Sequence, residues 1–268
     1  MTTPTTNRPV AVVTGASSGI GYELARQFAE HGYDLVIGAE DPGITRAAQE
    51  IQSMGAHVES VQADLATWDG VERLWNTATA GGRHPDAVAI NAGIGVGGDF
   101  ARDTDLRKEI KLVQLNCESV VHLAKLASRD MVNRGEGKIL ITSSIAATMP
   151  GPYETVYAAS KAFDLSFAEG LRGELKDTGV TVTALMPGPT DTNFFERAEL
   201  TDTKIGQGKK DDPAEVAKDG FEALMAGKDK VVAGSVKNKV QATAGRVMPD
   251  EAKAAMHKKM SEPGSGTQ

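Results

Sequence analysis

The stretch VAVVTGASSGIG, residues 10–21, joins a short apolar run to a turn that contains three glycines. A valine-rich run of this length that ends in glycine is typical of a buried β-strand. Gly15 permits a tight turn, Gly19 lets the backbone approach a diphosphate, and Gly21 permits close packing of the next helix. The free N–H groups at the start of that helix favour phosphate. The pattern therefore predicts a dinucleotide-binding turn rather than an ordinary tight turn, formed by Gly15, Ser17, Ser18, Gly19, Ile20 and Gly21.

Six more strand-like runs follow, and stretches with helical periodicity separate them. The seven predicted strands lie at 10–15, 34–39, 57–64, 86–93, 137–144, 179–188 and 229–234. Strands that alternate with helices form βαβ units and therefore a parallel sheet. Because the runs are apolar almost throughout, we expect the sheet to be buried on both faces. The sequence predicts an α/β fold: a single-domain, Rossmann-like, doubly wound parallel sheet of about seven strands with helices on both faces.

The domain boundaries follow from the ends of these patterns. The length of 268 residues fits one large α/β domain, and no linker divides the chain. We expect a flexible N-terminal tail at 1–8, a single dinucleotide-binding catalytic domain at 9–260, and a flexible C-terminal tail at 261–268. The basic helical segment at 231–260 is expected to pack on the domain or to contact another subunit.

Composition and charge argue against several classes of function. The chain is 40% hydrophobic and 24% charged, like an ordinary globular protein, and its net charge is −7. An acidic chain is a poor match for nucleic acid or an anionic membrane, and no run is long enough to span a bilayer. The start shows no secretory signal, Cys117 has no cysteine partner, and the histidines lack metal-ligand spacing. We therefore expect a cytoplasmic protein with no metal, no nucleic-acid partner and no membrane partner.

Glu40 follows the second predicted strand, 25 residues after Gly15. In folds of this kind an acidic residue near this position accepts hydrogen bonds from the adenosine ribose. A carboxylate there also repels the 2′-phosphate of NADP. Glu40 therefore favours NAD over NADP as the cofactor, unless it is an ordinary solvated loop residue.

Several short motifs, taken in order, resemble those of the short-chain dehydrogenase/reductase family. They are TGASSGIG (14–21), ADL (63–65), NAG (91–93), Asn116, TSS (142–144), YAASK (157–161) and PGPTDT (187–192). Any one of them is common, whereas the ordered set is specific. One departure concerns cofactor choice. Where the family has an aspartate for NAD, or an arginine one position later for NADP, this chain has Ala39 and Glu40.

The resemblance implies a role for each matching residue. The catalytic set would comprise Asn116, Ser144, Tyr157 and Lys161. Ser144 is selected over Ser143 because the family's second serine lies thirteen residues before the tyrosine. Asp64 and Leu65 would bracket the adenine. The remaining cofactor contacts would come from Asn91, Ala92, Gly93, Tyr157, Lys161, Pro187, Gly188, Thr190 and Thr192.

The spacing of Tyr157 and Lys161 suits proton transfer. Hydride transfer between a carbinol carbon and nicotinamide requires the hydroxyl proton to move as well. Free tyrosine, with a pKa of about 10, is a poor base near neutral pH. Lys161 lies one helical turn beyond Tyr157, so its charge is expected to lower the pKa of the tyrosine. Ser144 is placed to hydrogen-bond the substrate oxygen, and the resemblance implies that Asn116 holds a water that connects Lys161 to solvent.

The expected substrate is a small neutral alcohol or carbonyl compound. The segment 148–156 between Ser144 and Tyr157 is largely apolar, and Met149 and Tyr153 are its candidate substrate-lining residues. Residues at about 190–212 resemble the family's flexible lid. There Phe194 and Phe195 would close over an apolar substrate or pack within a short helix. Segments 105–134 and 154–176 resemble the helices through which family members assemble, so we expect a homo-oligomer, a dimer or tetramer.

Three functions remain open at this point. The first is an NAD(P)-dependent oxidoreductase that interconverts an alcohol and a carbonyl compound. The second is a nucleotide-binding regulator without turnover, but a sensor needs no proton relay of Ser144, Tyr157 and Lys161. The third is a sugar-nucleotide epimerase or dehydratase, whose glycine spacing and longer substrate domain this chain lacks.

Overall fold

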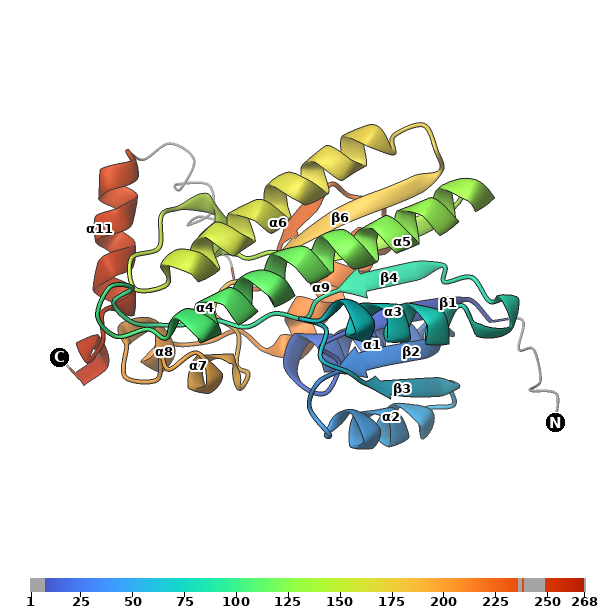
Figure 1. The fold of residues 1–268 in the computed structure, drawn as a ribbon, viewed down its shortest axis with the longest axis horizontal. Helices are drawn as coiled ribbons and strands as arrows, with labels where there is room; N and C mark the ends of the chain where they lie inside the picture. The colour runs from blue at the N-terminus through green and yellow to red at the C-terminus, as the bar shows by residue number, and fades with distance from the viewer. Residues whose placement is uncertain (1–7, 236–237, 239–248, 268) are drawn as a thin grey trace.

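A seven-stranded parallel sheet lies at the centre of the chain (Figure 1). In the computed structural model, which describes residues 8–235, 238 and 249–267, the strand order is β3-β2-β1-β4-β5-β6-β7. The strands are β1 (Val10–Thr14), β2 (Asp34–Ala39), β3 (Val58–Gln62), β4 (Ala87–Ile90), β5 (Gly137–Thr142), β6 (Val180–Met186) and β7 (Lys230–Val232). Each predicted run contains one strand, so the predicted doubly wound fold is confirmed.

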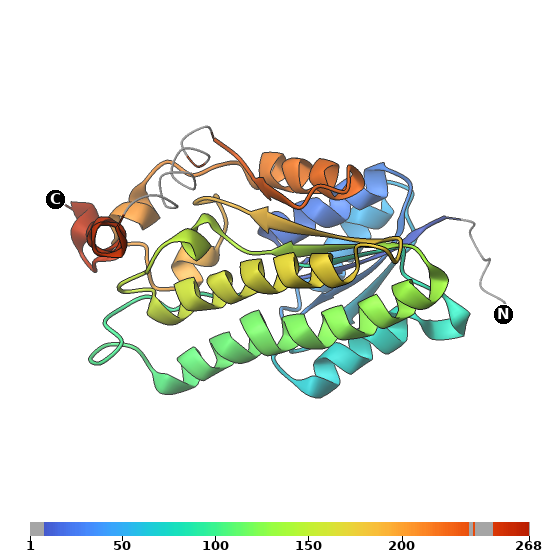
Figure 2. The ribbon, with the colours of Figure 1, turned by 90° about the horizontal axis from the view of Figure 1, so that it is seen from above.

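Helices cover both faces of the sheet (Figure 2). One layer consists of α1 (Gly19–Glu30), α2 (Ile44–Gln52) and α9 (Pro213–Met225), and the other of α3 (Trp68–Ala78), α5 (Ser119–Arg134) and α6 (Thr155–Glu174). Alternate residues of the inner strands pack against the two different helix layers. Ala11 and Val13 belong to the same core cluster as Phe28, whereas Val12 belongs to the cluster of Leu74. This alternation is the geometry of a strand, and it explains why the runs are apolar at every position.

The order of the strands reverses next to β1. The chain first passes outward from β1 through β2 to β3, and then returns to place β4 on the other side of β1. The connections that leave β1 and β4 therefore diverge at the carboxyl ends of these strands. In open parallel sheets this divergence leaves the crevice in which ligands bind.

A distorted helix crosses one face of the sheet. α4 (Leu106–Val113) and α5 are joined by a π-helical segment, Gln114–Glu118. Asp105 starts α4 by accepting a hydrogen bond from the N–H of Arg107, and Gly135 ends α5 in the left-handed conformation. Short π-helical segments often mark functional sites, and this one contains Asn116.

Backbone hydrogen bonds hold together the two ends of the segment that links β6 to α9. The N–H of Asp191 donates to the carbonyl oxygen of Asp211 at 2.8 Å, and the N–H of Asp211 donates to that of Pro189 at 2.8 Å. Between these ends lie two short helices, α7 (Phe194–Arg197) and α8 (Lys204–Gln207). We call residues 190–212 the lid segment, since they span the lid expected from the sequence.

Residues 261–267 are folded, in contrast to the flexible tail that we expected over 261–268. α11 (Asp250–Ser261) contacts α8, and Ser261 is fully buried. The next residues are held by Asp202, whose side chain accepts from the N–H of Gly264 and whose carbonyl accepts from that of Gly266. A glycine- and serine-rich composition suggests disorder, but it carries no signal for backbone bonds to a residue about 60 positions away.

Parts of two predictions lie outside the described residues. The predicted N-terminal tail is described only at Arg8, and the basic segment is not described at 236–237 and 239–248. None of the helices within the described ranges is both long and apolar enough to cross a membrane.

Phe28→Ala tests the packing of α1 against α9. The Phe28 ring is fully buried and contacts the rings of Tyr33 and Phe221 edge-on, with centroid distances of 5.1 and 5.2 Å. We expect a loss of about 3–5 kcal/mol in the free energy of unfolding, because the substitution removes buried contacts and leaves a cavity. Chemical denaturation measures the change. Phe100→Ala, at a ring that is 56% exposed, is the matched control; an equal loss in both variants would contradict the assignment.

Candidate active site

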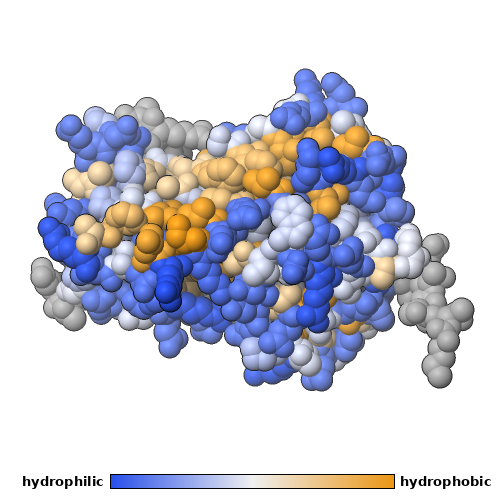
Figure 3. Space-filling view, viewed as in Figure 1, coloured by the Kyte–Doolittle hydropathy of each residue, from blue (hydrophilic) through white to orange (hydrophobic). Residues whose placement is uncertain are grey.

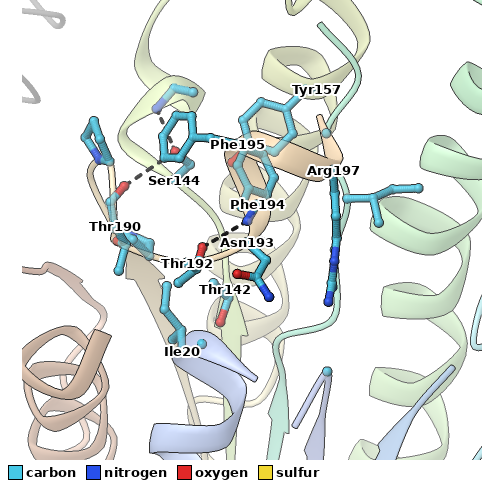
Figure 4. A pocket seen from close by; sticks show the side chains of 18 of the residues that line it. Ile20, Thr142, Ser144, Tyr157, Thr190, Thr192, Asn193, Phe194, Phe195 and Arg197 are labelled. Atoms are coloured by element: carbon cyan, nitrogen blue, oxygen red, sulfur yellow. Dashed lines mark hydrogen bonds between the residues drawn. The ribbon is translucent and has the colours of Figure 1, made fainter. Parts of the chain in front are cut away.

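One cavity of about 880 Å³ opens at the carboxyl ends of the strands. The close view in Figure 4 places Ile20 at one end of the group of side chains drawn and Tyr157 with Phe194 at the other. All the residues that the sequence predicted to bind cofactor line this cavity: Gly15, Ser17, Ser18, Gly19, Ile20, Gly21, Glu40, Asp64, Leu65, Asn91, Ala92, Gly93, Tyr157, Lys161, Pro187, Gly188, Thr190 and Thr192. The fold thus gathers residues that are up to about 180 positions apart in the chain.

The glycine turn has the shape of a phosphate cradle. Gly19 has a φ of 58°, which an L-residue rarely adopts, and a Cβ at position 21 would lie 2.2 Å from the carbonyl oxygen of Gly15. Ser18 precedes α1 in an extended conformation, but its side chain makes no capping hydrogen bond. No side-chain cap therefore occupies the first N–H groups of α1, which are available to an anion. These features fit the diphosphate of a dinucleotide.

Thr14 binds the glycine turn to the neighbouring strand. Its Oγ1 accepts hydrogen bonds from the N–H groups of Asn91 and Ala92, at 2.8 and 2.9 Å. The two cofactor motifs TGASSGIG and NAG are therefore held together by one hydroxyl. We did not predict this role, although Thr14 is the first residue of the quoted motif.

Glu40 is paired with a lysine that the sequence did not identify. The Nζ of Lys111, on α4, donates to both carboxylate oxygens of Glu40, at 2.9 and 3.0 Å. The same Nζ lies 3.2 Å from Oδ2 of Asp64. The hydrogen bond to Glu40 raises the pKa of Lys111. Lys111 is 71 residues from Glu40, so no local pattern could have revealed the pair.

Tyr157 lies in the first turn of α6, with its ring 5.1 Å from the ring of Phe194. Loss of solvation raises the pKa of Tyr157, and Glu154 raises it further, whereas Lys161 and Ser144 lower it. The net shift is upward. Lys161 therefore lowers the pKa of Tyr157, as expected. The loss of solvation has the larger effect, because a phenolate is poorly stabilised away from water.

Lys161 is buried and has two partners. Its Nζ donates to the carbonyl oxygen of Thr142 at 3.0 Å and to Oδ2 of Asp164 at 2.9 Å. Burial lowers the pKa of Lys161, but Asp164 and Tyr157 raise it, and the net shift is upward. Asp164 was not among the predicted site residues. Its position three residues after Lys161, on the same face of a helix, was the available signal.

Asn116 is fully buried and does not line the cavity. Its Oδ1 accepts from the N–H of Ile94 at 3.0 Å, and its Nδ2 donates to the carbonyl oxygen of Ile94 and to Oγ of Ser160. These bonds fix the loop after β4, which forms part of the cavity wall. The water-holding role expected for Asn116 remains a prediction.

The two neighbouring serines have different partners. The Oγ of Ser143 donates to the carbonyl oxygen of Lys161 at 2.7 Å and so holds α6 against β5. The Oγ of Ser144 accepts from the N–H of Ala146 and makes a long contact, 3.4 Å, with the carbonyl oxygen of Pro187, and its hydrogen bonding to Tyr157 lowers the pKa of that residue. The Ser144 hydroxyl is therefore the one more readily available to a ligand in the cavity.

A family model described as short chain dehydrogenase matches residues 9–203. The chain belongs to the short-chain dehydrogenase/reductase family. It is 38% identical to 1-deoxy-11-beta-hydroxypentalenate dehydrogenase of Streptomyces exfoliatus over 189 aligned residues, and this alignment covers 69% of each chain. It is also 30% identical to an uncharacterized oxidoreductase of Bacillus subtilis (strain 168), over 84% of this chain and 95% of that one.

Solved structures of this family superpose on the chain. A short-chain dehydrogenase from Sphingobium yanoikuyae in complex with NADPH has a TM-score of 0.79 at 27% identity, covering 88% of this chain and 92% of that one. The 3-ketoacyl-(acyl-carrier-protein) reductase from Brucella melitensis complexed with NADH has a TM-score of 0.74 at 26% identity, with 84% and 96% covered. The chain is therefore a short-chain dehydrogenase/reductase with a nicotinamide dinucleotide cofactor, an oxidoreductase.

The substrate end of this short-chain dehydrogenase/reductase only partly matches our expectation. Met149, Phe194 and Phe195 line the cavity, as predicted. Tyr153 does not: its backbone has a φ of 67°, and its hydroxyl donates to Glu262 at 3.3 Å. The Tyr153 side chain thus points away from the cavity, although Met149 and Glu154 of the same segment line it. Sequence position alone could not show this.

The structure adds polar residues at the same end. Glu154 and His257 line the cavity together with Met260. The Oγ of Ser261 donates to Oε2 of Glu154 at 2.7 Å, and Nε2 of His257 lies 3.6 Å from the same oxygen. Burial raises the pKa of Glu154. These contacts join α11 to the start of α6, close to Tyr157.

Gly21→Ala tests the close approach in the glycine turn. The added methyl group would lie 2.2 Å from the backbone oxygen of Gly15, which has little freedom to move. We expect the affinity for NADH or NADPH, measured by fluorescence titration, to fall at least about tenfold, or by about 1.4 kcal/mol. Gly173→Ala, on the exposed side of α6 with nothing within 4 Å, is the control. Unchanged dinucleotide affinity in Gly21→Ala would refute the role of the turn.

Proposed function

We propose that this chain interconverts an alcohol and a carbonyl compound with a nicotinamide dinucleotide, and that Tyr157 is its general acid and base. One observation carries the proposal: a single cavity contains the glycine turn at one end and Ser144, Tyr157 and Lys161 at the other. A dehydrogenase must hold its dinucleotide and its proton donor against the same substrate atoms. A regulator without turnover has no need of this arrangement.

The chemistry follows from the side chains at the reacting end. A bound nicotinamide would supply hydride to the carbonyl carbon or take it from the carbinol carbon. The Ser144 hydroxyl would hydrogen-bond the substrate oxygen, and Tyr157 would pass a proton to that oxygen or remove one from it. The buried ammonium of Lys161 would stabilise the phenolate that remains when Tyr157 has lost its proton.

We propose NAD as the preferred cofactor because of the charges near the adenosine end. Glu40 and Asp64 place two carboxylates there, and Lys111 supplies one positive charge to the pair. The local balance is therefore negative, which disfavours the 2′-phosphate of NADP. Lys111 also weakens this preference, because it neutralises part of the charge of Glu40.

The substrate that best suits the cavity is a neutral alcohol or ketone with an apolar substituent. Met149, Phe194 and Ile205 provide apolar surface, and Glu154 and His257 provide a polar boundary. An alcohol dehydrogenase from Comamonas testosteroni that is specific for bulky-bulky ketones has the same fold, with a TM-score of 0.75 at 25% identity, covering 90% of this chain and 93% of that one. An apolar ketone is therefore a sensible starting point for a screen.

The homo-oligomer and the cytoplasmic location stay predictions. Figure 3 shows apolar surface over α4 and along α5 and α6. Its exposed residues include Leu106, Ile110, Val113, Val121 and Phe163. These helices lie in the segments that we expected to form subunit contacts, so a second copy of this chain is the partner that we propose for this face.

Tyr157→Phe tests the acid-base role. We expect turnover to fall at least about a thousandfold, because the phenylalanine ring has no hydroxyl proton to exchange with the substrate oxygen. Dinucleotide affinity should stay within a few-fold of the wild type, since the ring and its contact with Phe194 remain. The assay follows absorbance of the reduced cofactor with a panel of alcohols and ketones. Retained turnover would exclude Tyr157 as the acid-base residue.

Titrations with NADH and NADPH test the cofactor preference. We expect the wild type to bind NADH about tenfold more tightly, because the local carboxylates repel the 2′-phosphate. Glu40→Gln should narrow or reverse this ratio, since Lys111 then becomes available to the phosphate. Glu50→Gln, which removes a carboxylate from its surface pair with Arg46, is the control. A wild type that clearly prefers NADPH would refute the assignment.

A further inference from the structure

A buried carboxylate lies beside Lys161. Asp164 has no exposed surface, and its Oδ2 lies 2.9 Å from Nζ of Lys161. Its Oδ1 is also buried and has no hydrogen-bond partner among the residues that the structure describes. Removal of a carboxylate from water is unfavourable by several kcal/mol unless specific contacts compensate it. An apolar residue would avoid this cost at an interior position of a helix, so the charge itself calls for an explanation.

The other titratable groups around the pair come from five elements. Glu154 caps the start of α6 beside Tyr157, and His257 on α11 lies behind it. Cys117 lies on the π-helical segment and Glu109 on α4, and the lid segment contributes Arg197 and Lys204 to the cavity lining. Burial raises the pKa of Cys117 to about 11, so its thiol is neutral near neutral pH. Within the described residues, Asp164 is the one acidic side chain in hydrogen-bond contact with Lys161.

Asp164 affects both members of the catalytic pair. Burial lowers the pKa of Lys161, and Asp164 is the largest of the contributions that raise it, so the ammonium form persists. Burial is the main cause that raises the pKa of Tyr157, and the negative charges of Glu154 and Asp164 raise it further, against the lowering effect of Lys161. Two opposite charges 2.9 Å apart exert a weaker field on a third group than the cation alone. Asp164 therefore keeps Lys161 charged and reduces the influence of that charge.

We propose that Asp164 is a positioning residue that holds Lys161 and offsets its charge, so that Tyr157 keeps its proton and is poised to donate it to a carbonyl substrate. The proposal rests on the proposed oxidoreductase function. Reduction of a carbonyl adds a hydride to carbon and a proton to oxygen; Tyr157 gives the proton and regains one from solvent. The site is thereby set for carbonyl reduction near neutral pH. Alcohol oxidation, which needs the phenolate, is displaced to alkaline pH.

The pH dependence of alcohol oxidation tests this role. Asp164→Asn removes the charge but keeps the size of the side chain and an acceptor for Lys161. At saturating oxidised cofactor, kcat/KM for the alcohol reports the ionisation of Tyr157 in the enzyme–cofactor complex. We expect the acid limb to move about one unit toward lower pH, and oxidation near neutral pH to rise up to about tenfold. Glu169→Gln, which removes an exposed carboxylate paired with Lys230 on the same helix, should leave the profile unchanged.

A second measurement does not depend on turnover. NMR of isotope-labelled tyrosine follows the ionisation of Tyr157 in the cofactor-free protein, with its signal assigned by its absence from Tyr157→Phe. We expect Tyr157 to lose its proton at lower pH in Asp164→Asn than in the wild type. An unchanged or raised midpoint, or loss of the proton from Lys161 instead, would overturn the proposal. A wild type without any turnover would count against the oxidoreductase function, and the tyrosine titration would still decide the role of Asp164.

Discussion

The parallel pairing of β1 with β2 on one side and β4 on the other is the constraint on which the site depends. Because the two connections diverge, the carboxyl ends of these strands are left open to a ligand. Thr14 sets the distance across the opening, since its hydroxyl accepts hydrogen bonds from two successive N–H groups after β4. The glycine turn therefore faces a fixed wall, and the rest of the cavity is built around that contact.

At the reacting end, the ionisation of Tyr157 depends on the balance between its loss of solvation and the charges of its neighbours. Tyr157, Lys161 and Asp164 lie within two turns of α6, where the protein replaces most of the surrounding water. A phenolate, an ammonium and a carboxylate are all unfavourable in such a place when alone, and each becomes tolerable only beside the others. The proton affinity of Tyr157 is therefore a property of the group of residues, and a single neighbouring charge cannot predict it.

The substrate end is shaped by the parts of the chain that differ most from an open parallel sheet. The lid segment is closed at its base by the hydrogen bonds of Asp211, and it supplies Phe194 to the wall beside Tyr157. α11 reaches the same region, where Ser261 bonds Glu154 in a fully buried contact. Both elements follow Lys161 in the sequence, yet they form the cavity wall next to Tyr157.

Local sequence patterns predicted the parallel sheet, the glycine turn and the cofactor-binding residues that line the cavity together with Ser144, Tyr157 and Lys161. Those features depend on local periodicity, and on short motifs in which glycine, serine, tyrosine and lysine have positions set by the backbone. The pairing of Glu40 with Lys111, the turn of Tyr153 away from the cavity and the folded C-terminal end were decided only by the tertiary structure. Each depends on a contact between distant segments or on the loss of water around a charge. Neither the contact nor the loss of water exists until the chain has folded, which is why the pKa of Tyr157 shifts upward although a lysine lies one helical turn beyond it.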